Sequence, residues 1–147
     1  WIGGLAGDSW LKGALQAAGA WSHLKPEPRD PVFAAVFPNH RWVAPADAEG
    51  LRHELSALWP GEAENIRACL DELAQMGRSF LSLVDGPATT GPLARWQDAT
   101  LREFLQSHTR HEEVQAALAV LWPLAGLSPS RLSAVHYAMP VSYTHLR

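Results

Sequence analysis

The spacing of apolar residues changes at Pro45, and this change restricts the folds open to the chain. Before it, Val32–Phe37 and Arg41–Ala44 are β-branched, aromatic or apolar runs separated by Pro38-Asn39-His40, which has the composition of a turn. After it, apolar residues recur every three or four positions, as on one face of a helix. The pattern predicts an α+β fold that is mainly helical, with a short antiparallel hairpin at about 32–44 and five to six helices.

Capping residues and turn formers set the expected helix limits. Before the hairpin, Asp8 or Ser9 can cap a helix from Trp10 to about Ala18, which Gly19 ends. After it, we expect a helix from Asp47 to Pro60-Gly61, the longest helix from Glu62 to Val84, and a loop from Asp85 to Pro92.

Two later segments carry the Thr-x-x-Glu capping box, in which hydroxyl and carboxylate bond the free amides of a helix start. They begin at Thr100 and Thr109, and the second predicts a helix from Arg110 to Trp122. Ser128 followed by Pro129 predicts the start of a last helix that runs to about Met139.

Composition excludes several classes of protein. The 147 residues include 12 Lys and Arg against 15 Asp and Glu, so the basic surface that nucleic acids require is not expected. The single cysteine, Cys69, cannot form an internal disulfide or build a zinc or iron–sulfur site by itself. No stretch approaches the roughly 20 apolar residues of a membrane span. We therefore expect a cytoplasmic protein or one in peripheral contact with a membrane, of undetermined oligomeric state.

Features at both ends of the sequence indicate that the chain is a fragment of a longer protein. It opens at Trp1 rather than at an initiator methionine. Val141–Arg147 resembles the peptide that results when a sequencing-library adapter is read through in frame. We therefore assign residues 1–140 to a partial domain and 141–147 to a non-native tail. The alternative is a native strand, because this run is rich in β-branched and aromatic residues.

Motifs for nucleotide, metal or nucleophile chemistry are weak. Gly3-Gly4-x-x-Gly7 lacks both the spacing and the preceding strand of a dinucleotide-binding loop. His111-Glu112 begins like the zinc motif His-Glu-x-x-His, but Gln115 replaces the second histidine, and His108 is better explained by a solvated helix start. No serine lies in a Gly-x-Ser-x-Gly elbow, and Cys69 is expected to be a buried, inert thiol. We predict no metal site and no catalytic side chain.

Seven tryptophans are many for a chain of this length. Trp59, Trp96 and Trp122 lie at expected helix or loop ends, where their flat apolar rings would suit a polyene or an acyl chain. The alternative is ordinary core packing, since aromatic side chains contribute much of the buried area of most cores.

The order of short motifs resembles the FAD-dependent oxidoreductases that include phytoene desaturases, carotenoid isomerases and retinol saturases. The resemblance covers residues 1–140 and departs from the family at Trp59, where phenylalanine is expected. It rests on the order of these segments: Trp1-Ile2-Gly3-Gly4-Leu5, Asp30-Pro31, Phe37-Pro38, Pro45-x-Asp47, Leu58-Trp59-Pro60-x-Glu62, Thr100-Leu101-x-Glu103-Phe104-Leu105 and Gly126-Leu127-Ser128-Pro129-Ser130.

The resemblance implies an internal fragment of a two-domain flavoprotein, belonging to its substrate-binding (cap) domain. The FAD would be bound by parts of the parent enzyme outside this chain, and this part would line a tunnel for a carotenoid, a retinoid or a related apolar lipid. This fragment alone would be inactive. The residues expected to contact substrate are Phe80, Leu118, Leu121, Trp122, Tyr137 and Met139. The competing hypothesis is a self-contained, non-enzymatic helical module that binds an apolar ligand or a partner helix.

Overall fold

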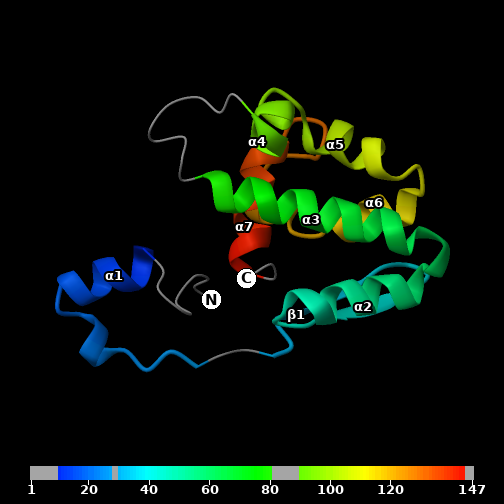
Figure 1. Ribbon diagram of the computed structural model, residues 1–147. Helices are drawn as coiled ribbons and strands as arrows, with labels where there is room; N and C mark the ends of the chain where they lie inside the picture. The colour runs from blue at the N-terminus through cyan, green and yellow to red at the C-terminus, as the bar shows by residue number, and fades with distance from the viewer. Residues whose placement is uncertain (1–9, 28–29, 81–89, 145–147) are drawn as a thin grey trace.

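The computed structural model describes residues 10–27, 30–80 and 90–144 (Figure 1). These residues form seven α-helices, three 3-10 helices and one two-stranded hairpin, which confirms the expected mainly helical fold with a hairpin. The glycine-rich segment Trp1–Gly7 and the expected caps Asp8 and Ser9 lie outside the described residues.

The hairpin consists of β1 (Phe33–Val36) and β2 (Arg41–Ala44), which pair antiparallel as predicted. Phe33 lies opposite Ala44 and Val36 opposite Arg41, and the amide of Phe37 closes the turn on the carbonyl of His40 at 2.9 Å. Because successive side chains of a strand point to opposite faces, Ala35 is buried while Val36 is exposed.

Two helical segments precede the hairpin and lie apart from the rest of the fold (Figure 1). They are α1 (Trp10–Ala17), close to its predicted limits, and η1 (Trp21–His23). Gly19, with φ of +69°, ends the first segment in the left-handed conformation that glycine tolerates best.

After the hairpin, α2 (Ala48–Leu58) begins at the predicted cap, where the Asp47 carboxylate accepts from the amide of Gly50 at 2.8 Å. Then follow η2 (Pro60–Glu62) and α3 (Ala63–Ser79). The predicted helix 62–84 was too long at both ends. Glu62 belongs to the 3-10 turn that Pro60 begins, and α3 ends at Ser79 with Phe80 as its C-cap. Residues 81–84 lie outside the described ranges.

Two short helices come next. The first, α4 (Gly91–Trp96), was not predicted, and its first two residues were assigned to the preceding loop. Gly91 has φ of +77°, and Pro92 occupies the first turn, where its missing N–H costs nothing. In α5 (Leu101–His108), both hydrogen bonds of the predicted Thr100–Glu103 capping box are present.

The second predicted capping box is wrong. The Thr109 hydroxyl donates to Glu62 at 2.6 Å instead of capping a helix, and α6 (Glu112–Leu118) starts two residues later than predicted. The expected helix 110–122 also ends early: Ala119 closes α6, and Pro123 opens η4 (Trp122–Ala125), which Gly126 ends with φ of +70°.

The last helix, α7 (Ala134–Thr144), starts later than predicted from Ser128-Pro129. The preceding segment instead pairs with the start of α5: Leu101 N donates to Leu132 O at 2.7 Å, and Arg102 N to Pro129 O at 2.9 Å. The helix also runs past Met139, so the strand alternative is wrong for residues 141–144; residues 145–147 lie outside the described ranges.

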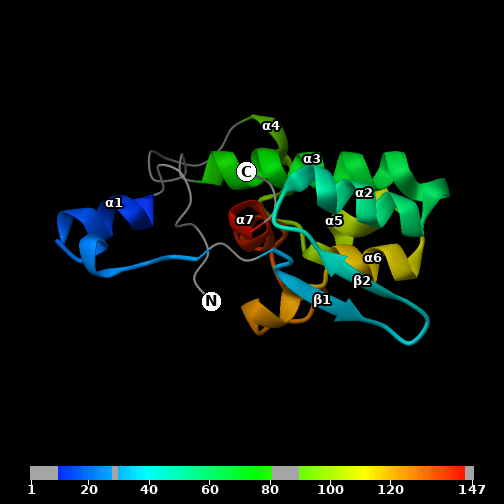
Figure 2. The same ribbon diagram turned by 90° about the horizontal axis from the view of Figure 1, so that it is seen from below.

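The core lies between α3, α7 and the elements around them. In Figure 2, α7 is seen nearly end-on, with α3 on one side and η4 and the hairpin on the other. The buried apolar side chains form one continuous cluster that runs from Ala35 to Val141. None of the helices in the described part of the chain has the length and apolar character needed to cross a membrane.

Candidate functional site

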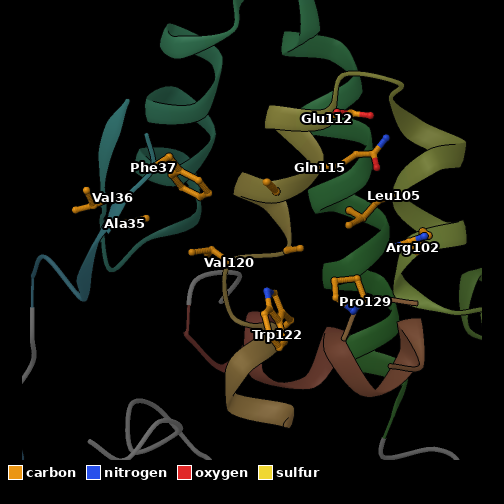
Figure 3. A pocket seen from close by; sticks show the side chains of 12 residues that line it. Ala35, Val36, Phe37, Arg102, Leu105, Glu112, Gln115, Val120, Trp122 and Pro129 are labelled. Carbon is orange, nitrogen blue, oxygen red and sulfur yellow. The ribbon is translucent and has the colours of Figure 1, made fainter. Parts of the chain in front are cut away.

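A groove of about 420 Å³ opens between the hairpin, α5, α6 and the segment that follows α6 (Figure 3). Its volume falls in the range of about 300–1,000 Å³ that is usual for small-molecule sites. The lining residues are Ala35, Val36, Phe37, Arg102, Leu105, Glu112, Gln115, Ala116, Ala119, Val120, Trp122 and Pro129.

The hairpin wall of the groove is fixed to α6 at its tip. Asn39 Nδ2 donates to Glu113 Oε1 at 3.3 Å, across the surface. Behind this contact the Phe37 ring stacks on His40 with centroids 4.6 Å apart, and His40 meets the edge of Trp59 at 4.8 Å. Such aromatic pairs add to the stabilisation that burial supplies. The hairpin is therefore joined to α6 by a surface hydrogen bond and to the end of α2 by aromatic contacts, one of which involves the lining residue Phe37.

The groove has a markedly apolar part. Val120, Trp122 and Pro129 line it from the segment after α6, and Leu105 lines it from α5. Val36 is 76% exposed and Trp122 is 39% exposed. Leu124 and Leu127, which are also exposed, belong to the same segment as Trp122. Several large apolar side chains thus remain in contact with solvent here, whereas the core beneath is closed.

The polar part of the groove comes from the first turns of α5 and α6. Gln115 Nε2 is engaged, since it donates to the carbonyl of Thr109 at 2.8 Å. Arg102 and Glu112 line the groove and are both exposed. Among the described residues, neither of these charged groups takes part in an ion pair. One cation and one anion are therefore available to a ligand.

The six residues expected to contact substrate are not brought together by the fold. Trp122 lines the groove. Leu118, Leu121 and Tyr137 line a small gap of about 20 Å³ beside the core, with room for about one water molecule. Phe80, packed against the core at the end of α3, and Met139, half-buried on α7, line neither space.

The environment of Tyr137 shows what holds this part of the core together. Its hydroxyl donates to the carbonyl of Leu118 at 2.6 Å and accepts from the amide of Leu121 at 3.4 Å. These two bonds satisfy the backbone where α6 ends. Burial raises the pKa of the Tyr137 hydroxyl, which therefore stays protonated.

The sequence did not identify Val36 and Phe37 of the hairpin, or the charged residues Arg102 and Glu112, as lining a groove. A local signal existed for Val36, because a large apolar residue on the outward face of a two-stranded hairpin has no core to contact. No such signal marked Arg102 or Glu112, whose position depends on how α5 and α6 pack.

His108 and His111, which the sequence placed near a helix start, both make contacts within the fold. His108 Nε2 lies 3.0 Å from Glu72 Oε2, which also accepts from Trp96 Nε1 at 2.9 Å. His111 packs against the edge of Trp59. In residues 10–27, 30–80 and 90–144, no three His, Cys, Asp or Glu side chains are grouped so that they could hold a metal ion.

Cys69 lies in the core on α3 and is fully buried. Burial raises the pKa of its thiol, and the nearby Glu72 carboxylate adds to the effect. A thiol in this state is a poor nucleophile, because the thiolate is the reactive form.

No family model matches this chain, and no curated protein or solved structure matches it either. The family resemblance of the motif order accordingly stays a prediction, and the groove is the feature on which a function can be argued.

Proposed function

We propose that this chain is part of the substrate-binding domain of a flavin-dependent oxidoreductase, similar to the phytoene desaturases, carotenoid isomerases and retinol saturases. In this proposal its groove holds a polyene, a retinoid or a related apolar lipid. The observation that carries the proposal is the uncovered apolar surface: Trp122 and Val36 stay exposed at a groove whose underlying core is closed.

Two features of the groove support a lipid as the ligand. Its lining is a mixture of many apolar side chains and few polar ones, which is usual for small-molecule sites. No described pair of lining side chains forms a nucleophile and a base, so the lining suits positioning of a ligand better than acid–base chemistry. Positioning and exclusion of water are the tasks of a protein whose cofactor carries out the reaction.

The described residues do not fit an FAD site. Flavin nucleotides are held by glycines between a buried strand and a helix, at the helix amino terminus. Here the described glycines with positive φ are Gly19, Gly91 and Gly126, and none of them links a buried strand to a helix. In the proposal FAD therefore belongs to other parts of the parent enzyme, and this chain alone does not turn over substrate.

The alternative, a self-contained module that binds an apolar ligand or a partner helix without catalysis, is favoured by a different observation. The buried apolar residues form a single cluster within this chain, from Ala35 to Val141. A chain with its own core should unfold in one cooperative transition.

Binding can be tested by titrating the chain with all-trans-retinol and following the fluorescence of the retinol itself. We expect saturable binding that Trp122→Ala weakens about tenfold, a loss of about 1.4 kcal/mol. Leu58→Ala is the matched control, because it removes an exposed apolar side chain from α2, which does not line the groove. Absence of saturable binding, or equal effects of both substitutions, would refute the proposal.

The enzyme fragment and the independent module differ in the behaviour of the isolated chain. The fragment should self-associate through its uncovered apolar surface. The module should be monomeric and should melt cooperatively. Sedimentation velocity and thermal melting of the same preparation separate them, and steady turnover of retinol after addition of FAD would contradict both.

A further inference from the structure

The charged groups of the groove narrow the class of ligand. We propose that the groove takes an elongated apolar ligand with a terminal carboxylate, which Arg102 binds, in preference to a pure hydrocarbon. This inference rests on the proposed function, since it assumes that the groove is the lipid site.

Arg102 is placed to receive such a head group. It lies in the first turn of α5, and its backbone amide donates to the carbonyl of Pro129, another lining residue, at 2.9 Å. This bond fixes the base of the side chain at the wall of the groove. Its guanidinium has no ion pair among the described residues. A guanidinium offers donors in a planar fork that matches a carboxylate.

Other donors near Arg102 already have partners. The amide of Leu101 donates to Leu132 O, and that of Glu103 donates to the Thr100 hydroxyl, so the start of α5 has few free N–H groups for an anion. The Gln115 side chain donates to Thr109 O. The Trp122 indole N–H is neutral. Arg102 is thus the positively charged group in the lining that remains free for a ligand.

Glu112 affects the orientation in which a charged ligand would bind in the groove. It lies in the first turn of α6, toward the opposite end of the groove from Trp122, with Arg102 on the α5 side (Figure 3). A ligand carboxylate is repelled by the Glu112 carboxylate and attracted by Arg102. The two charges therefore favour one orientation, in which the head group meets Arg102 and the apolar chain extends along Val120 and Trp122.

The test uses two fluorescent probes that share one apolar chain, cis-parinaric acid and its methyl ester. We expect the acid to bind the wild-type chain about tenfold more tightly than the ester, because a charge-assisted hydrogen bond is stronger than a neutral one, although solvent near Arg102 weakens this advantage. Arg102→Gln should lower the affinity for the acid to that for the ester and leave the ester unchanged. Glu112→Gln should strengthen binding of the acid.

Each result decides the matter. Equal affinities of acid and ester for the wild-type chain, or an equal loss of both in Arg102→Gln, would overturn the carboxylate inference and leave the lipid site standing. If neither probe binds and retinol does not bind either, the proposed function and this inference are overturned together. Unchanged melting of Arg102→Gln verifies that the variant is folded, as expected for an exposed side chain.

Discussion

The hydroxyl of Thr109 donates a hydrogen bond of 2.6 Å to the carboxylate of Glu62, joining the end of α5 to the turn before α3. The same oxygen accepts from the amide of His111 at 3.0 Å. Thr109 is the buried polar residue of the described part of the chain, and both bonds are made where the backbone changes direction.

Replacing Thr109 by valine keeps its shape and removes both bonds. We expect the free energy of unfolding to fall by about 1–3 kcal/mol, because the part-buried amide of His111 and the Glu62 carboxylate both lose a hydrogen-bond partner. Thr109→Ser keeps the hydroxyl and should recover much of the loss. Urea denaturation of the three proteins measures the difference. A stable valine variant beside a destabilised serine variant would show that the methyl group matters and the hydroxyl does not.

The Tyr137 hydroxyl should contribute to stability and not to ligand binding. Tyr137→Phe removes the bonds to Leu118 O and Leu121 N without creating a cavity, so we expect a loss of about 1–2 kcal/mol. Retinol affinity should stay unchanged, since Tyr137 does not line the groove. A variant that melts normally but binds retinol more weakly would return Tyr137 to the substrate site.

Glu72 joins α3 to α4 and α5 by accepting from Trp96 Nε1 and contacting His108. Glu72→Ala should cost about 1–3 kcal/mol, because it leaves the part-buried indole N–H without a partner. Glu64→Ala is the control from the same helix: its carboxylate is exposed and pairs with Arg67, a contact worth about 0–1 kcal/mol. Thermal melts of both should differ clearly, and similar shifts would argue against the role of Glu72.

The capping box of α5 makes stability depend on pH. The amide and then the hydroxyl of Thr100 donate to the Glu103 carboxylate and lower its pKa from the ordinary value of 4.5. The stabilisation is therefore complete above pH 4.5 and is lost as the pH falls through the lowered pKa. The stability difference between wild type and Glu103→Gln should shrink in this acid range, as followed by urea denaturation at each pH.

Cys69 should not react while the chain is folded. Burial in the core excludes reagent and raises the pKa of the thiol. A disulfide reagent such as dithionitrobenzoate should modify it only at the rate of unfolding, and fully in guanidinium. Rapid modification of the native chain would show that α3 opens locally or is packed differently.

Local signals predicted the parts of the fold that depend on neighbours in sequence. The hairpin, the Asp47 cap and the Thr100 capping box all formed as expected. Two of the failures share one physical cause, which is competition from a distant segment. The Thr109 hydroxyl donates to Glu62 and therefore does not cap α6. The start of α5 bonds to the carbonyls of residues 129 and 132, in the segment where the last helix was expected to begin.

The residues of the candidate site were harder to predict from the sequence, because their exposure also depends on contacts between distant segments. Trp122 was singled out as a large apolar residue at a helix end, and it lines the groove. Tyr137 was expected to contact substrate on the strength of the family resemblance, yet it is buried with its hydroxyl bonded to the backbone. Apolar character alone does not separate the two, because the separation depends on which side of each helix the other elements cover.

The helical pair before the hairpin has a consequence for the energetics of the whole chain. No residue from 11 to 27 is buried, and the hydrophobic cluster begins at Ala35. We therefore expect the described residues of α1 and η1 to contribute little to the stability of the core that the later helices form. Hydrogen exchange should accordingly find two regimes in one polypeptide, fast in the first helices and slow in α3 and α7.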